Sequence, residues 1–195
     1  MSELVARTGR QQQRYEDGCR LIAGCIPFKY RSPSKRSDGA SKNILEVLMI
    51  SSASGRGLVF PKGGWENDET VEEAAVREAA EEAGVRGELL SFFQEFLGYY
   101  EFKSKTLQDE CCPEGLCKAA MFALLVKEEL QVWPEQSTRK RIWLTIPEAV
   151  HSCRDQWMRS ALKEGFVRWH EDQGMSSTKE DENRVILTDS SLHES

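Results

Sequence analysis

Three glutamates and one arginine fall within the eight residues of the stretch REAAEEAG, which spans residues 77–84. On a helix, Glu78, Glu81 and Glu82 would share one arc of about 100°, with Arg77 at its edge, one turn before Glu81. Like charges at this spacing destabilise a helix by a few tenths of a kcal/mol per pair, so an opposing charge is needed. A hard divalent cation such as Mg²⁺, which binds carboxylate oxygens and substrate phosphates, would supply it. The stretch therefore indicates a metal site for phosphate chemistry.

A second interpretation of the same stretch is a solvated acidic helix face, held by an ion pair between Arg77 and Glu81. Taken alone, the helix favours this second interpretation. The preceding run LVFPKGGWENDE changes the balance. A strand that ends at Pro61 would be followed by a tight bend at Gly63 and Gly64, whose main-chain groups can face the same cation or phosphate as the glutamates. The combination favours the metal site.

The spacing between these two segments is distinctive. From Gly63, five residues lead to Glu69 and seven more lead to Arg77, after which the chain continues as EAAEEAGV to residue 85. This pattern resembles the Nudix box, and its one departure is Ala79, where the motif prefers Ile, Leu or Val. The resemblance implies an α/β fold, the Nudix α/β/α sandwich, with a mixed β-sheet between the box helix and a C-terminal helix. It also implies a pyrophosphohydrolase that splits a diphosphate linked to another moiety.

The resemblance implies a role for each charged residue of the box. Glu78 and Glu82 would bind the metal, with Mg²⁺ as the expected ion and Mn²⁺ as a second candidate. Glu81 would be a metal ligand or the general base. Arg77 would orient the carboxylates and Glu69 would brace the loop, so both count with Glu81 as catalytic residues. Water activated by the metal would attack phosphorus.

The wider chain resembles the plant branch of Nudix enzymes related to diphosphoinositol polyphosphate phosphohydrolases, some of which also act on diadenosine polyphosphates. The stretches RTGRQQQRY, GCIPF, LVFPKGGWENDETVEEAA, WPEQ and RKRIWL carry this resemblance. A small-molecule polyphosphate needs several Lys and Arg donors close together, although any one of them could instead be a solvated surface charge. The candidate substrate-binding residues are Arg14, Arg20, Ser51, Ser52, Lys62, Gly63, Gly64, Arg139 and Arg141.

The base of a dinucleotide substrate would also need aromatic faces. Phe28, Trp65, Tyr99 and Tyr100 are candidates, although aromatic residues in strands more often belong to the core. Two other functions stay open, namely hydrolysis of nucleoside diphosphate derivatives of the ADP-ribose or NADH type, and a weakly catalytic module that binds phosphorylated ligands. Retention of every charged residue of the box disfavours the binding module.

The remaining sequence predicts the elements that would position this site. Strand-length apolar runs lie at residues 21–28, 44–51, 57–60, 119–126 and 141–144, and the run 89–102 fits more than one strand or a bend at Gly98. Capping signals predict two helices, over residues 70–84 and 145–170. Loops are expected at residues 31–43 and 104–118. Strands, a helix, more strands and a helix fit a sheet between two helices.

Charge is unevenly distributed along the 195 residues, whose net charge is −6. Residues 1–43 hold nine Lys and Arg against four acids, whereas residues 171–195 hold seven acids against two bases. We predict an N-terminal arm at residues 1–13, a Nudix domain at 14–170 and an acidic, disordered tail at 171–195. The net charge argues against nucleic acid, no apolar run would span a membrane, and protein partners stay unknown.

The first residues lack the apolar block of a secretory signal, and Glu3, Glu16 and Asp17 argue against a transit peptide. The expected location is therefore cytoplasmic, with the nucleus also open and mitochondria less favoured. An intracellular chain keeps its cysteines reduced, so Cys111, Cys112 and Cys117 are expected to be loop thiols, with a metal site as the less favoured alternative.

Overall fold

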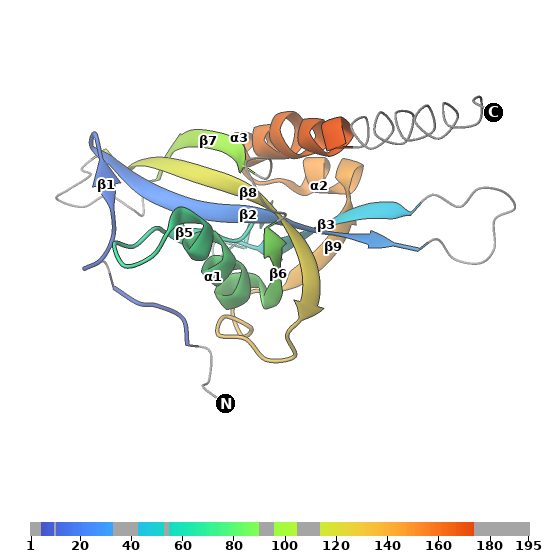
Figure 1. Ribbon diagram of the computed structural model, residues 1–195, viewed down its shortest axis with the longest axis horizontal. Helices are drawn as coiled ribbons and strands as arrows, with labels where there is room; N and C mark the ends of the chain where they lie inside the picture. The colour runs from blue at the N-terminus through green and yellow to red at the C-terminus, as the bar shows by residue number, and fades with distance from the viewer. Residues whose placement is uncertain are drawn as a thin grey trace, which may run out of the picture.

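The computed structural model describes residues 5–9, 11–32, 43–52, 55–89, 96–104 and 114–173. Within these residues, nine strands form one sheet with helices on both of its faces (Figure 1). The strands are β1 (Tyr15–Glu16), β2 (Cys19–Arg31), β3 (Ile44–Ser51), β4 (Leu58–Val59), β5 (Lys62–Gly64), β6 (Val85–Leu89), β7 (Phe96–Lys103), β8 (Leu116–Glu129) and β9 (Arg141–Thr145). The helical segments are α1 (Val71–Ala83), α2 (Ile146–Ser152), α3 (Gln156–Ser160) and the π-helical η2 (Ala161–Val167).

The sheet is mixed, as predicted. Its main path runs β4-β3-β2-β8-β6, with β1 and β5 paired to β2, β7 paired to β8, and β9 paired to β3. Only the β2–β8 pair is parallel among the described strands, with Ala23 opposite Ala120. Both central strands are longer than their apolar runs, because the polar ends of β2 and β8 still pair with neighbouring strands.

The helix α1 forms where its end signals predict it. The Thr70 hydroxyl accepts a hydrogen bond from the Glu73 main-chain N–H at 3.2 Å, and the Glu73 carboxylate accepts one from the Thr70 N–H at 2.8 Å. Gly84 ends the helix in the left-handed region at φ +62°. Small residues on one side, including the fully buried Ala75 and Ala79, let the helix lie close against the sheet. The box helix is therefore fixed by local signals and by tight packing.

The glycine segment differs from its prediction. We expected a tight bend at Gly63 and Gly64, but Lys62–Gly64 forms the short strand β5, with Gly64 opposite Ile22 of β2. The glycines are required by space, because a Cβ atom at Gly63 would collide with the carboxylate of Glu78 on α1. The absence of a side chain at Gly63 therefore lets the carboxylate helix lie close to the backbone of β5.

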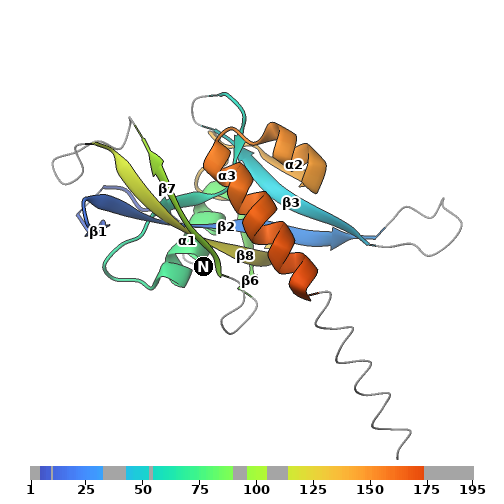
Figure 2. The same ribbon diagram turned by 90° about the horizontal axis from the view of Figure 1, so that it is seen from above.

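The C-terminal helical region is also different from its prediction. The expected single helix is interrupted at Cys153, which has extended backbone angles and bridges to Leu58, and the Arg154 N–H donates to the Leu58 carbonyl at 2.9 Å. Helical structure resumes at Gln156 and continues through residue 173, three residues beyond the expected domain boundary. These segments cover the sheet face opposite α1 (Figure 2). The predicted α/β/α sandwich is thus confirmed, with a broken second helix layer.

Of the run 89–102, Leu89 is the last residue of β6 and residues 96–102 belong to β7, which has a register shift between Phe96 and Gly98. The described part of the run therefore holds one strand and the end of another. Most of the expected loop 31–43 lies outside the described residues, as do Cys111, Cys112 and the chain beyond residue 173. Cys117 is buried at the start of β8 rather than in a loop. No helix in the described part of the chain is long and apolar enough to cross a membrane.

Candidate active site

The three carboxylates of α1 are buried rather than displayed to solvent. Glu78, Glu81 and Glu82 are 8%, 4% and 7% exposed. We refer to these three residues as the carboxylate ridge. Strand β5, the turn that follows β8 and the chain before β1 cover the ridge, so its charges cannot be balanced by bulk water alone. The solvated-face interpretation of the sequence does not describe this helix.

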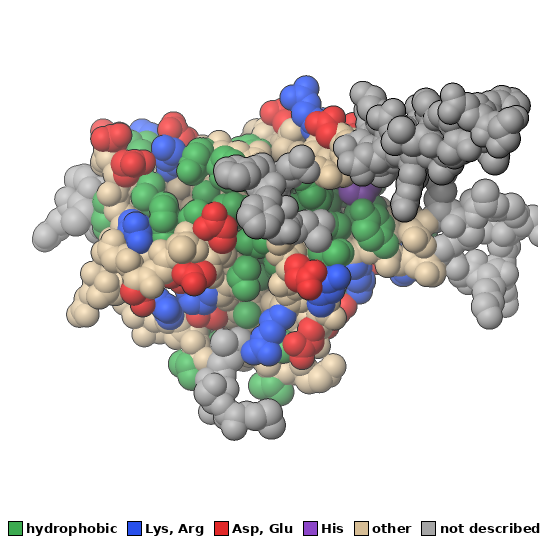
Figure 3. Space-filling model, viewed as in Figure 1, with side chains coloured by type: hydrophobic (Ala, Val, Ile, Leu, Met, Phe, Trp, Pro, Cys, Tyr) green, Lys and Arg blue, Asp and Glu red, His purple; other side chains and the backbone are tan. Residues whose placement is uncertain are grey.

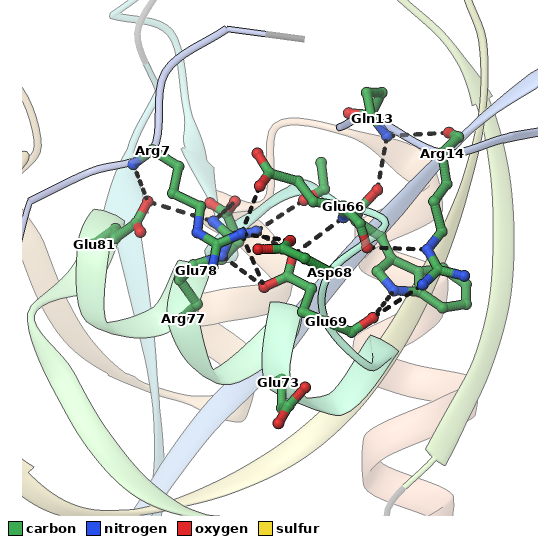
Figure 4. Close-up of polar contacts among 12 residues, drawn as sticks. Arg7, Gln13, Arg14, Glu66, Asp68, Glu69, Glu73, Arg77, Glu78 and Glu81 are labelled. Carbon is green, nitrogen blue, oxygen red and sulfur yellow. Dashed lines mark hydrogen bonds and ion pairs between the residues drawn. The ribbon is translucent and has the colours of Figure 1, made fainter. Parts of the chain in front are cut away.

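Arg77 connects the ridge to the preceding loop (Figure 4). Its guanidinium donates to both oxygens of Glu69, from Nε at 2.9 Å and from Nη2 at 2.7 Å. Nη1 donates to Glu78 Oε1 at 2.6 Å, and Nη2 also donates to the Gly64 carbonyl at 2.9 Å. The ion pair expected with Glu81 is present but longer, at 3.4 Å. Arg77 thus joins the loop, strand β5 and the ridge in one network.

Glu82 is held by a different set of donors. Its Oε2 atom accepts a hydrogen bond from the Lys62 main-chain N–H at 2.9 Å. Its Oε1 atom accepts one from Arg139 Nη2 at 2.7 Å, and Arg139 also binds the Glu135 carboxylate and the Ser51 carbonyl. Glu82 therefore accepts hydrogen bonds from β5 and from the turn before β9.

Burial dominates the electrostatics of the ridge. It raises the pKa of Glu78 to about 8, with the charge of Glu82 acting in the same direction against the opposing effect of Arg77. Burial also raises the pKa of Glu81 and of Glu82 above the usual range. For Glu69, burial acts upward, but the hydrogen bonds from Arg77 and from the Glu66 main-chain N–H, together with the charges of Arg77 and Arg7, lower the pKa. The ridge therefore favours an added positive charge, either a proton or a metal cation.

The structure brings part of the predicted substrate-binding set to the ridge. Lys62 and Gly63 of β5 lie against Glu82 and Glu78, as described above, and Gly64 accepts from Arg77. Arg139 reaches Glu82 directly. Ser51 joins the group through its carbonyl, which accepts from Arg139 Nη1 at 3.0 Å.

Two predicted residues bind other parts of the chain near the loop. Arg14 Nε donates to the Glu66 carbonyl at 2.9 Å, and its guanidinium lies 4.4 Å from the centre of the Trp65 ring. Arg20 is buried and donates to the Tyr15 hydroxyl at 3.1 Å. Both side chains therefore serve as internal supports in this structure.

The last two predicted residues, Ser52 and Arg141, donate hydrogen bonds to main-chain carbonyls outside the ridge. Arg141 Nη1 donates to the Gly84 carbonyl at 2.8 Å, beyond the last turn of α1, and its guanidinium lies 4.3 Å from the Trp133 ring centre. Ser52 Oγ donates to the Arg56 carbonyl at 2.8 Å. These contacts are to main-chain carbonyls, so a role in substrate binding stays a prediction for both.

A hollow of about 580 Å³ opens beside the loop that precedes α1. Of the four aromatic candidates, Trp65 and Tyr99 line it, whereas Phe28 is in the core and Tyr100 donates to the Leu97 carbonyl. The hollow is lined by Gln13, Arg14, Tyr15, Glu16, Leu21, Ile22, Trp65, Asn67, Tyr99, Lys118 and Ala120. It combines cationic, aromatic and polar groups, which suits a phosphorylated organic ligand.

Several residues at the site were not singled out from the sequence. Arg7 contacts the ridge and the loop at residues 66–69, which we call the acidic loop. Glu66 and Asp68 accept hydrogen bonds from the Arg7 guanidinium, and Glu135 accepts one from Arg139, as Glu82 does. The available signals were a basic residue in the expected N-terminal arm, extra acids within GGWENDE, and the stretches RTGRQQQRY and WPEQ, which contain Arg7 and Glu135. None of these signals identifies a partner so far away in sequence.

A mixed sheet between a carboxylate-bearing helix and C-terminal helices is the architecture of one class of hydrolases. A family model described as the NUDIX domain matches residues 37–165. The chain belongs to the Nudix hydrolase family. In fold it is similar to a Caenorhabditis elegans Ap4A hydrolase in a binary complex, with a TM-score of 0.53 and 20% identity over 78% of this chain and 98% of the other.

Plant relatives agree with the family assignment. Nudix hydrolase 16, mitochondrial, from Arabidopsis thaliana is 66% identical over 173 residues, which is 89% of this chain and 94% of the relative. Nudix hydrolase 13, mitochondrial, from the same plant is 53% identical over 93% of this chain and 89% of the relative. The expected cytoplasmic location is wrong by this comparison, because both relatives point to mitochondria. Acidic residues such as Glu3, Glu16 and Asp17 therefore do not exclude a mitochondrial location.

Nudix hydrolases generally use divalent metal ions such as Mg²⁺. Among the described residues, no three His, Cys, Asp or Glu side chains already have the arrangement of a metal site, and arginines contact the ridge oxygens. The donor set nevertheless fits a hard cation, because it consists of buried carboxylates of raised pKa on one helix face.

Proposed function

We propose that the chain hydrolyses a diphosphate bond in a polyanionic small molecule, with Mg²⁺ bound by Glu78, Glu82 and Glu81. The two substrate classes proposed are diphosphoinositol polyphosphates and diadenosine polyphosphates. Membership of the Nudix hydrolase family supports the reaction type. The choice of substrate rests on the chemistry of the site and on the resemblance described above.

The carboxylate ridge is the observation that carries the proposal. Three buried acids on one helix face are costly unless a cation or proton compensates them. A chain that only needed a stable helix at this position would be better served by apolar residues. Retaining Glu78, Glu81 and Glu82 therefore supports a role in holding a cation.

Each side chain would have a task set by its contacts. A bound metal would lower the pKa of water and neutralise charge that develops on the leaving phosphate. Arg77 keeps Glu78 and Glu69 in fixed orientations, and the Lys62 N–H does the same for Glu82. Among the described residues, Arg7 and Arg77 both donate to Glu81 Oε2, so Oε1 is the oxygen proposed to hold a proton or a metal.

The substrate would enter beside the ridge. The hollow near the preceding loop carries Arg14, Lys118, Trp65 and Tyr99, and Lys118 Nζ lies 4.8 Å from the centre of the Tyr99 ring. On the face seen in Figure 3, Lys and Arg side chains are mixed with Asp and Glu side chains. This mixture favours a small ligand in a local site over an extended polyanion such as nucleic acid.

The test is a substrate panel with Mg²⁺, measuring phosphate release from a diphosphoinositol compound and nucleotide release from a diadenosine polyphosphate. We expect turnover of at least one of them, and Glu82→Gln should lower kcat by about a hundredfold or more because a metal ligand is lost. Glu72→Gln is the matched control, since Glu72 lies exposed on the first turn of the same helix.

Three results would contradict the proposal. The first is tight binding of these ligands without turnover, which would indicate a binding module. The second is turnover confined to ADP-ribose or NADH. The third is an equal loss of activity in Glu72→Gln and Glu82→Gln, which would show that the substitutions act through helix stability rather than through the metal.

A further inference from the structure

Arg7 lies across the acidic loop and the carboxylate ridge, far from both in sequence (Figure 4). Its Nη1 atom donates to Glu66 Oε2 at 2.6 Å and to Asp68 Oδ1 at 2.8 Å. The same atom lies 3.9 Å from Glu69 Oε2, and the Arg7 main-chain N–H donates to Glu81 Oε2 at 3.3 Å. One residue thus contacts the loop through its side chain and the ridge through its backbone.

The chain just after Arg7 is fixed to the same loop by main-chain hydrogen bonds. The Asn67 N–H donates to the Gln12 carbonyl at 2.8 Å, and the Arg14 N–H donates to the Trp65 carbonyl at 3.0 Å. Gln13 Nε2 adds a bond to the same Trp65 carbonyl at 3.2 Å. The placement of Arg7 therefore does not depend on its own ion pairs alone.

We propose that Arg7 is a positioning residue, which holds the loop 66–69 and Glu81 in the arrangement needed for the hydrolysis proposed above. The inference rests on that proposed function. Glu81 receives a main-chain hydrogen bond from Arg7 at 3.3 Å and a side-chain hydrogen bond from Arg77 at 3.4 Å, so both residues help to orient this carboxylate. Glu69, which orients Arg77 through two hydrogen bonds, lies in the loop that the Arg7 side chain contacts.

This role has two measurable consequences with opposite signs. Loss of the guanidinium removes the ion pairs to Glu66 and Asp68, which loosens the loop and, with it, the main-chain contact of Arg7 to Glu81, so the chemical step should slow. Removing a positive charge beside Glu66, Asp68 and Glu69 makes the site more negative, so a divalent cation should bind more tightly. A variant that was only poorly folded would lose both activity and metal binding.

The experiment compares Arg7→Ala, Arg7→Lys and the wild type in the full chain. For Arg7→Ala we expect kcat to fall by about tenfold with KM changed by less than about twofold, in line with the loss of residues that orient metal ligands. Mg²⁺ binding, measured by calorimetry without substrate, should tighten by about two- to fivefold. For Arg7→Lys, both kcat and Mg²⁺ affinity should lie between those of the wild type and Arg7→Ala. The lysine ammonium keeps the positive charge but lacks the planar guanidinium with its several N–H donors.

Arg86→Ala is the matched control, since Arg86 is an exposed arginine with one long ion pair, 3.7 Å, to Glu128 on β8. It should leave kcat and Mg²⁺ affinity unchanged. An Arg7→Ala variant with wild-type kcat would overturn the inference, and one with raised kcat would show that the segment obstructs the site instead. Weaker Mg²⁺ binding would also overturn it. In each of these cases the proposed function would still stand, provided that the wild type turns over its substrate and Glu82→Gln does not.

Discussion

Glu78 makes the stability of the metal-free protein depend on pH. Its pKa is about 8 in the folded protein, against an ordinary value of 4.5, because burial and Glu82 disfavour its charged form. Between these two values the folded state binds more protons than the unfolded state, so the free energy of unfolding must fall as pH rises. The raised pKa values of Glu81 and Glu82 act with the same sign.

We therefore expect the metal-free protein to unfold at lower urea concentration at pH 8 than at pH 5.5. Mg²⁺ should remove much of this difference, because binding a cation replaces the proton. Urea unfolding followed by circular dichroism, with and without chelator, measures both effects. Glu78→Gln should flatten the pH profile of the metal-free protein, and a profile that stays as steep would show that other groups control it.

Residue-level prediction from the sequence succeeded where the partners are local. The clustering of Glu78, Glu81 and Glu82 follows from helical spacing alone, and so does the contact of Arg77 with Glu81. Burial of the ridge was not predictable, because it is produced by β5 and by residues such as Arg139, which lies 57 residues from Glu82 in sequence. The same distance in sequence concealed Arg7, whose partner Glu81 is 74 residues away.

At the scale of the element, the end of α1 depends on a residue from another strand. The last turn of α1 contains no basic residue, and Arg141 of β9 supplies the missing cation by donating to the Gly84 carbonyl at 2.8 Å. A positive charge at a helix C-terminus stabilises it by about 0.3–1 kcal/mol, or more when partly buried. This placement gives Arg141 a structural role that competes with its predicted role in substrate binding.

Arg141→Ala should therefore lower the free energy of unfolding by about 1 kcal/mol and leave KM for the substrate unchanged. Urea unfolding and steady-state kinetics on the same preparation separate the two roles. Arg154→Ala is a suitable control, since Arg154 is a partly exposed arginine with a 3.7 Å ion pair to Asp155. A rise in KM at undiminished stability would instead support Arg141 as a substrate-binding residue.

Helix ends illustrate which element boundaries a sequence can reveal. Thr70, Glu73 and Gly84 act on neighbouring residues, so both ends of α1 were predicted correctly. The sequence does not reveal the interruption of the second helix at Cys153, because Leu58 of β4 imposes it. The Leu58 carbonyl accepts a hydrogen bond from the main-chain N–H of Arg154, the residue after Cys153. Strand β5 was likewise missed, since its pairing with β2 is not encoded in a glycine pair.

At the scale of the whole molecule, the sheet separates the carboxylate ridge from much of the stabilising core. The ridge and its arginines lie on the α1 face, whereas α2, α3 and η2 cover the other face (Figures 1 and 2). The element order predicted this sandwich because both long helical patterns need a sheet face to bury their apolar side. Substitutions beneath the C-terminal helix should consequently affect stability far more than the chemical step.

Phe166 tests this separation. Its side chain is fully buried in η2, and its ring lies 5.2 Å from that of Phe28 on β2 and 5.6 Å from that of Trp169. Phe166→Ala should lower the free energy of unfolding by about 3–5 kcal/mol, because the cavity left behind cannot be filled by rigid neighbours. Below its melting temperature, the folded fraction should keep kcat within about twofold of the wild type, since η2 covers the sheet face opposite α1.

Val132→Ala is the control for this experiment, since Val132 is 78% exposed and its truncation should change stability by less than about 0.5 kcal/mol. Chemical unfolding and kcat, measured at one temperature on the same samples, give both quantities. A Phe166→Ala protein that remained folded but lost kcat by more than about tenfold would show that the two faces of the sheet are coupled. In that case the C-terminal helix would have to be counted as part of the active site, because Phe28 lies on β2, which pairs with the strand β5 that lies against Glu78.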